Sequence, residues 1–238
     1  MDNATRLTIF NAQVANVRAL KSAIRHIRRA VNDGLRKGNE AQARVHTKVL
    51  AQTFCSWAEA NFSKVIHTPH GFTLVEIAEV KRVWSAQSLA DAWIKAVDLG
   101  LKKVPAQRSG FVPNARQTVL RHISTYVTSP ALLRNKVAHG QWEFALNRSN
   151  TAVNAELTAA MNNLDIIAID RWQGGHERLA GIVESLIESP ERTFARDYWP
   201  QLMDLDDFTR ESGLWTMAAK REALRRKARP NPANNVTP

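Results

Sequence analysis

Apolar residues recur at steps of three and four along the first hundred residues, where glycine and proline are scarce. Between residues 4 and 36 this stripe consists of Phe10, Val14, Val17, Leu20, Ile24, Ile27, Val31 and Leu35. The period matches the 3.6 residues of a helical turn and predicts a long helix with one side facing a core. The same spacing predicts two more helices, over residues 40–65 and 73–101.

The next stretch of the chain contains more helix breakers. A loop with glycine and proline over residues 102–115 is expected to precede a helix over 116–127. Ser129, as an N-cap, and Pro130, at the first helical position, predict the start of another helix. The core side of that helix is expected to consist of Leu133, Val137 and Phe144.

The following pattern is less regular. A helix is expected to begin near Val153, and the apolar run LDIIAID at residues 164–170 is compatible with either a helix or a strand. Gly174 and Gly175 predict a turn before a last amphipathic helix over residues 177–187.

These patterns together predict an all-α protein. The main unit is expected to be a helical bundle over residues 1–188. Residues 189–228 are predicted to form a basic helical extension, and residues 229–238, with their prolines and asparagines, a disordered tail.

The composition excludes several classes of site. A single cysteine, Cys55, excludes an intramolecular disulfide, and its apolar neighbours are typical of a buried thiol. No group of Cys and His has the spacing of a structural zinc site, so no metal centre is expected. No run approaches the ~18 apolar residues of a membrane helix, and the first residues do not resemble a secretion signal. A soluble cytoplasmic protein without a membrane partner is therefore expected.

The net charge of +11 is concentrated at the two ends of the chain. Residues 1–50 carry ten Lys and Arg against three Asp and Glu, and residues 216–238 carry six against one. Basic clusters bind phosphates because they release condensed counterions. A polyanion is therefore the expected partner; an anionic membrane surface is the alternative, but the apolar residues of the first helix fit a core better.

A basic stripe accompanies the apolar one between residues 4 and 36. Its members share one helical face and are Arg18, Lys21, Arg25, Arg28 and Arg36, with Arg29 beside them. Few acids are interspersed for i, i+4 pairs, so the stripe is compatible with a phosphate-binding role and with an ordinary solvated face. The predicted RNA-binding residues are Arg18, Lys21, Arg25, Arg28, Lys102, Lys103 and Arg121.

The segment LLRNKVAHGQW, residues 132–142, places polar residues in an otherwise apolar helical stretch. Asn135 and His139 are four residues apart and share a helix face, whereas Arg134 lies about 140° round from the histidine and must use its length to reach the same groove. Judged by composition alone, such residues are more often surface or interhelix groups than catalytic ones.

One reaction suits these residue types. An RNA 2′-hydroxyl can attack the adjacent phosphodiester while histidine transfers protons and arginine stabilises the charged phosphorane, which leaves a cyclic 2′,3′-phosphate and a 5′-hydroxyl. No cofactor is required. The reaction needs both a base and an acid, and a twofold dimer would supply a second histidine. If one chain acted alone, His122, with Arg121 next to it, would be the first candidate for the acid.

The segment RNKVAHG closely resembles the Arg, polar, three-variable, His signature of the HEPN superfamily (higher eukaryotes and prokaryotes nucleotide-binding). The resemblance extends over residues 5–188, and the segments GQWEFALN and VNAELTAAMNNLD are similar to bacterial HEPN proteins linked to toxin and phage-defence systems. It implies an antiparallel helical bundle that dimerises through the motif helix.

The resemblance also implies an activity, a metal-independent endoribonuclease. Arg134 and His139 would form the catalytic pair and Asn135 would support them. An antitoxin or defence-system protein is an implied partner, and Glu59 is a candidate for the acidic residue that family members often place near the pair. The alternative is a non-catalytic HEPN module that binds RNA or a protein, with Arg134 and Asn135 as interface hydrogen-bond donors.

Overall fold

The computed structural model describes residues 2–105 and 110–226, except for the side chains of Arg134 and Ala195. Over these ranges the chain is helical without a β-strand, which confirms the all-α prediction. The α-helices are α1 (Asn3–Arg36), α2 (Glu40–Ile66), α3 (Leu74–Ala86), α4 (Leu89–Leu101), α5 (Phe111–Ile123), α6 (Ser129–Ala138), α7 (Ala155–Asn162), α8 (Ile166–Glu188), α9 (Ala195–Gly213) and α10 (Met217–Arg226). Two short π-helical segments are η1 (Ser124–Thr128) and η2 (Pro190–Phe194).

Helices α1 and α2 form a long hairpin with the bounds that their apolar period predicts. Asp2 caps α1 by accepting a hydrogen bond from the Thr5 amide, and Asn39 caps α2 in the same way from Gln42. The turn between them uses Gly38 at φ +70°, a left-handed conformation that favours glycine. Gly34 lets the two helices approach, since a Cβ there would lie 3.1 Å from the Ala43 amide nitrogen.

The helix predicted over residues 73–101 is wrong in one respect, because it is two helices. The chain breaks after α3, and Ser88 begins α4 as an N-cap that accepts a hydrogen bond from the Asp91 amide. Ser88 also donates to the Asp91 carboxylate at 2.5 Å. The two hydrogen bonds between Ser88 and Asp91 are those of a helix N-terminus, so they favour a new helix start at Ser88 over a continuous helix.

Helices α5 and α6 belong to one rod, so the predicted N-cap at Ser129 is wrong. Ser129 has a helical backbone, makes no capping bond, and its amide donates to the Ser124 carbonyl five residues earlier. Pro130 has no N–H for the Tyr126 carbonyl and its ring would crowd that oxygen, so the helix widens into η1 instead of ending. The imidazole Nδ1 of His176 lies 3.4 Å from the same carbonyl.

The turn predicted at Gly174 and Gly175 is also wrong, because both lie inside α8. They are points of close contact: a Cβ on Gly174 would lie 2.3 Å from the Phe208 ring, and one on Gly175 would lie 2.1 Å from the Tyr126 ring. The ambiguous run at residues 164–170 is the start of α8, which Asp165 caps. Close helix packing therefore explains the glycine pair.

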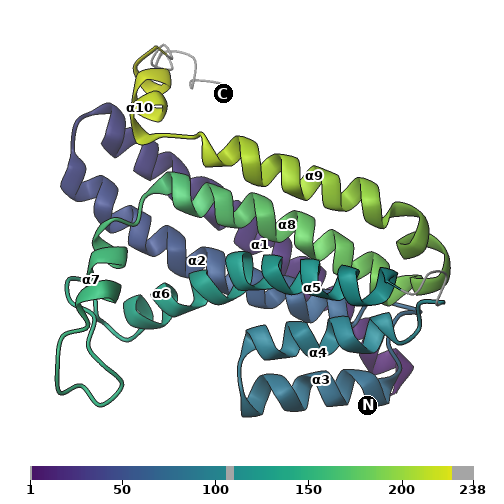
Figure 1. Ribbon diagram of the computed structural model, residues 1–238. Coiled ribbons are helices and arrows are strands. Elements are labelled where there is room, and N and C mark those ends of the chain that lie inside the picture. Colours follow the sequence, from purple (N-terminus) through teal and green to yellow (C-terminus); the bar gives the residue numbers. More distant parts are fainter. Residues whose placement is uncertain (1, 106–109, 227–238) are drawn as a thin grey trace, which may run out of the picture.

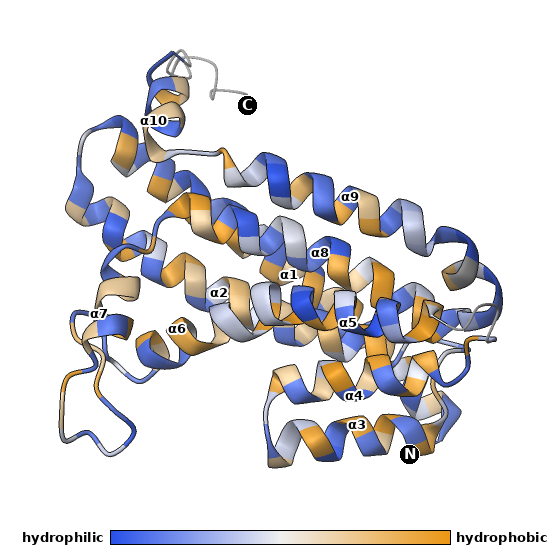
Figure 2. Ribbon diagram, in the orientation of Figure 1, coloured by the Kyte–Doolittle hydropathy of each residue, from blue (hydrophilic) through white to orange (hydrophobic). Residues whose placement is uncertain are grey.

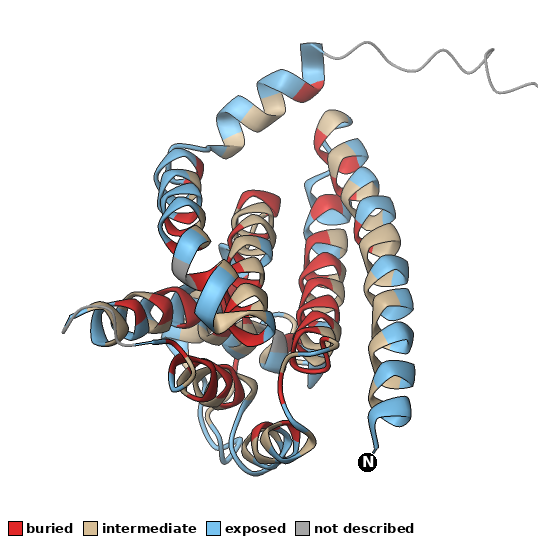
Figure 3. Cartoon of the chain, turned by 90° about the vertical axis from the view of Figure 1, so that its right-hand side faces the viewer, coloured by how far each residue is buried: buried red, intermediate tan, exposed pale blue. Residues whose placement is uncertain are grey.

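The core is organised around α2 and α8. One cluster packs α1 against α2 and the first turns of α8, and a larger one joins the end of α2 to α3, α4, α5, α8 and α9. Figure 1 shows α8 along the middle of the molecule, between α9 and the α2 and α5 side. In Figure 3 α1, which starts at the N label, lies at the right-hand edge and has few buried residues. Figure 2 shows orange and blue residues alternating around α8 and α9, as in amphipathic helices.

The C-terminal helices close one side and one end of the bundle. The predicted division at residue 188 separates α8 from α9, yet α9 contributes Tyr198 and Leu205 to the larger core cluster. Helix α10 lies across the end of the α1–α2 hairpin, where Leu224 is buried. The tail predicted over residues 229–238 lies outside the described residues.

Candidate functional site

The motif residues lie at the C-terminal end of α6. The helix ends at Ala138, not near Phe144 as predicted, and Phe144 is 63 % exposed in the loop that follows. Gly140 adopts φ +77°; its amide donates to the Val137 carbonyl and the Gln141 amide to the Lys136 carbonyl. These two bonds form a Schellman motif, in which a left-handed glycine ends the helix. The Gly140 that follows the motif histidine thus terminates the helix.

Asn135 and His139 are both exposed at this end, on one face of the last helical turn. The His139 amide donates to the Asn135 carbonyl at 3.1 Å, which fixes the two residues one turn apart. Leu132 continues the same face three residues earlier and is 52 % exposed. Arg134 lies on the same helix, but its side chain is outside the described part of the structure. The exposed face therefore offers an amide, an imidazole and an apolar contact together.

A buried lysine of α2 holds the segment that follows His139. Lys48 is only 3 % exposed, and its Nζ donates to the Trp142 carbonyl and lies 3.3 Å from a carboxylate oxygen of Glu143. The Trp142 indole nitrogen donates to the Val137 carbonyl at 3.0 Å, so the tryptophan returns to the helix end. These contacts fix the direction in which the chain leaves α6. Sequence reasoning missed Lys48, because its partner Trp142 lies 94 residues away in the sequence.

The loop between α6 and α7 is held against a small core of its own. Val137, Ala145 and Met161 are buried together there. The Lys136 ammonium group donates a hydrogen bond to the Leu146 carbonyl at 2.6 Å, so this side chain binds within the loop. An isolated bridge between Leu146 and Val153 closes the loop. The end of α6 is thus a packed structure rather than a free helix terminus.

His122 lies too far from His139 to act with it in one chain. The two residues are separated by 17 positions of the nearly continuous α5–η1–α6 rod, which corresponds to roughly 25 Å at 1.5 Å per residue. His122 is buried against Tyr126, and its Nε2 lies 3.3 Å from the Asp206 carboxylate without hydrogen-bond geometry. Burial lowers the pKa of His122, while Asp206 opposes that shift. The histidine therefore belongs to the α5–α9 interface.

The predicted basic stripe on α1 is partly engaged inside the chain. Lys21 pairs with Glu177 at 2.9 Å, and Arg28 binds Asp170 and Gln173, so these two cations join α1 to α8. Arg18 and Arg25 are exposed and, within the described residues, have no ion-pair partner. These two remain available to a polyanion.

The other predicted RNA-binding residues lie at the far end of α4 and on α5. Lys102 is exposed, whereas Lys103 pairs with Glu76 at 2.8 Å and lies over the Phe72 ring. Arg121 is exposed and 3.6 Å from Asp206. Together with the α1 stripe, these cations are spread over several surfaces rather than gathered beside His139.

Cys55 and Glu59 lie on α2 opposite the start of α6. Cys55 is buried, as predicted, and its thiol lies 3.9 Å from the Pro130 carbonyl. Glu59 is half-buried, and both residues line a small cavity with Pro130 and Ala131. Glu59 is therefore beside the motif helix, near its first turn.

Within residues 2–105 and 110–226, no three His, Cys, Asp or Glu side chains gather as they would around a metal ion. In the same ranges no helix is long and apolar enough to cross a membrane. The chain matches no family model, no curated protein and no solved structure.

Proposed function

We propose that the protein is a metal-independent endoribonuclease of the HEPN type. The observation that carries this proposal is the exposed pair of Asn135 and His139 on one face at the packed end of α6, in the motif spacing. The Schellman end and the Lys48 contact support it, because a reacting group must be held in place to orient a phosphodiester. The resemblance of RNKVAHG to the HEPN signature supplies the reaction class.

The proposed reaction needs no group from outside the protein and its RNA. One neutral histidine takes the proton of the 2′-hydroxyl, whose oxygen then bonds to the adjacent phosphorus. A second, protonated histidine gives its proton to the departing 5′-oxygen, which leaves a 2′,3′-cyclic phosphate and a 5′-hydroxyl. Arg134 and Asn135 stabilise the charged phosphorane by donating hydrogen bonds. Histidine suits both roles because it changes charge near neutral pH.

The second histidine comes from a second copy of the chain. His122 is about 25 Å along the rod and cannot serve within one chain. A twofold axis near the end of α6 places the two His139 residues in one groove, and Leu132 supplies apolar contact on the same face. The active form in this proposal is a homodimer. From the HEPN resemblance we place it in a toxin–antitoxin or phage-defence setting, where an antitoxin or defence-system protein restrains it.

This proposal predicts cleavage that survives metal removal and depends on concentration. Wild-type protein in excess EDTA is expected to cut single-stranded RNA, and the activity per chain is expected to fall when the protein is diluted below its dimerisation constant. The measurement is gel analysis of labelled RNA, paired with light scattering over the same concentrations. Absence of cleavage would support the alternative, a non-catalytic HEPN binding module. Equal activity per chain from a monomer would contradict the shared groove.

A further inference from the structure

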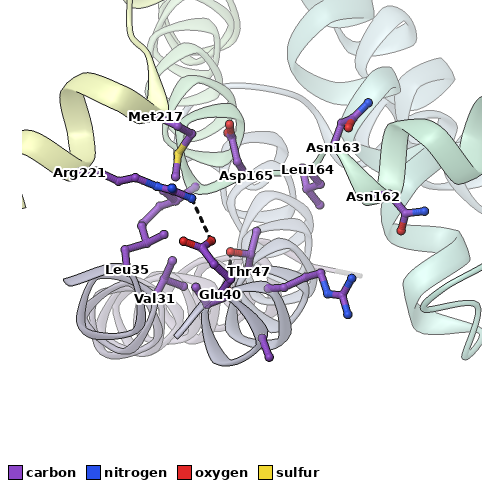
Figure 4. A pocket seen from close by; sticks show the side chains of 14 residues that line it. Val31, Leu35, Glu40, Thr47, Asn162, Asn163, Leu164, Asp165, Met217 and Arg221 are labelled. Atoms are coloured by element: carbon purple, nitrogen blue, oxygen red, sulfur yellow. Dashed lines mark hydrogen bonds and ion pairs between the residues drawn. The ribbon is translucent and has the colours of Figure 1, made fainter. Parts of the chain in front are cut away.

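A cavity of about 450 Å³ lies between α10 and the α7–α8 junction, at the end of the α1–α2 hairpin. Its walls come from the end of α1, the start of α2, the α7–α8 junction and α10, and Figure 4 shows the side chains that face it. The lining residues on the apolar side are Val31, Leu35, Leu164, Ile166 and Met217. The volume lies within the range of small-molecule sites, which combine an apolar wall with a few polar groups.

The polar groups of this cavity include amides that are free for a ligand. Asn162 is the last residue of α7 and Asn163 is its C-cap; both are exposed and make no side-chain hydrogen bond with other described residues. Figure 4 shows both near one edge of the cavity. An asparagine amide offers a donor and an acceptor, which suits the edge of a nucleobase. On the opposite side Arg221 of α10 pairs with Glu40 at 2.9 Å and links α10 to α2.

Arg44 connects the cavity to the segment that follows His139. It lines the cavity from α2, its side chain is 57 % exposed, and its closest acid is Glu143 at 3.9 Å. Glu143 lies four residues after His139 and is also bound by Lys48, one helical turn beyond Arg44. The distance of 3.9 Å, in water, makes the Arg44 pair a weak one. A phosphate between the cavity and the motif could therefore take this guanidinium.

The two basic ends of the chain meet beside the cavity, whose own lining is balanced, with Glu40 and Asp165 facing Arg44 and Arg221. Helix α10 is anchored on the end of α1 by buried Leu224, whose carbonyl accepts a hydrogen bond from Arg36. Lys37 and Arg225 are exposed and unpaired within the part of the chain that the structure describes. The two positive ends that were predicted to meet a polyanion thus lie side by side next to the cavity.

We propose that this cavity is a subsite for one unpaired nucleotide of the RNA strand that is cut at His139. The base lies against the apolar wall, Asn162 and Asn163 bind its edge, and Arg44 binds a phosphate between this nucleotide and the scissile one. A base in a duplex cannot enter, so the subsite selects single-stranded RNA. The inference rests on the proposed nuclease function for the position of the strand, while the binding itself does not require cleavage.

The test measures binding in a chain that cannot cut. In a His139→Ala background, a labelled single-stranded octanucleotide and the matched duplex are titrated by fluorescence anisotropy at several salt concentrations. Asn163→Leu removes the amide, Arg44→Gln removes the charge, and Ala41→Trp fills the mouth of the cavity from an exposed position on α2. The matched control is Arg82→Gln, an exposed arginine of α3, outside the cavity.

Each cavity variant is expected to weaken single-strand binding about five- to tenfold. Arg44→Gln should also lower the slope of log Kd against log salt by about 1, whereas Arg82→Gln should bind within about twofold of its parent. On the active chain the same three substitutions are expected to raise KM with little change in kcat. Wild-type-like binding by all three variants, or equal affinity for the duplex, would overturn the subsite. If the wild-type chain cuts no RNA but the cavity variants still lose binding, the nuclease proposal fails and the nucleotide site stands.

Discussion

His139→Ala is expected to lower the rate of RNA cleavage by about 10³-fold or more, with little change in stability. The imidazole is exposed at the C-cap of α6, and it makes no hydrogen bond or ion pair with the described side chains. The substitution removes both the base and the acid of a shared groove, and each proton transfer contributes roughly 10²- to 10⁴-fold. The measurement is the initial rate of cleavage in EDTA, with chemical denaturation to compare the free energies of unfolding.

The matched control is His26→Ala, which removes an exposed histidine from α1. This variant is expected to cleave at the wild-type rate. Equal rates for His139→Ala and the wild type would remove His139 from the mechanism. A loss of activity with a large loss of stability would mean instead that the residue maintains the helix end.

Acid is expected to destabilise the fold through His176. This residue is 0 % exposed, its ring lies 5.2 Å from that of Trp57 and 5.4 Å from that of Trp93, and its Nε2 has no partner in the described residues. Burial lowers the pKa of His176 to about 4, against the smaller opposing effects of the Tyr126 carbonyl and Glu177. The native state therefore keeps this histidine neutral.

The direction of this change in the free energy of unfolding follows from where each state binds a proton. Below about pH 6.5 the unfolded chain takes a proton at this position that the folded chain does not take until about pH 4. The stability is thus complete above pH 6.5 and falls as the pH is lowered to 4, by roughly 2 to 3 kcal/mol from this residue. Denaturant unfolding at pH 7 and at pH 4.5 measures the change.

His176→Phe isolates the contribution of this group from that of the carboxylates, which also titrate in acid. The variant is expected to be less stable at pH 7, because the contact with the Tyr126 carbonyl is lost. Its loss of stability between pH 7 and pH 4.5 should be smaller than that of the wild type by the same 2 to 3 kcal/mol. An equal loss in both chains would show that His176 does not carry the acid sensitivity.

Local pattern predicted α1 and α2 because each is long, periodic and capped by a nearby side chain, as Asp2 and Asn39 show. Ser88 and Asp91 have the spacing of a helix N-terminus, which is a local signal for the break. The apolar pattern continues across this point, however, and by itself predicts one helix. Local reasoning failed where a distant contact decides the structure. Ser129 does not cap α6, because the chain is already helical through η1, and Gly175 does not turn the chain, because the Tyr126 ring of η1 packs against it.

In the candidate site, too, local pattern predicted some features and distant contacts determine the others. Spacing predicted that Asn135 and His139 share a face, and the structure places both exposed at the end of α6. The contact that holds this end comes from Lys48, 94 residues before its partner Trp142, and no local pattern indicates it. The cavity requires three stretches that are far apart in sequence, residues 31–47, 162–166 and 217–221, to meet, so it could be found only in the folded chain.

The most direct measurement of the proposed chemistry uses one RNA strand with a single 2′-deoxy position. The wild-type cleavage site is first mapped in EDTA, and the strand is then made with a 2′-deoxynucleotide on the 5′ side of the scissile bond. Because the 2′-hydroxyl is the proposed nucleophile, we predict a 2′,3′-cyclic phosphate from the all-RNA strand and no cleavage at the substituted position, both read by mass spectrometry. Cleavage of the substituted strand at the original rate, or products with a 5′-phosphate, would contradict the mechanism.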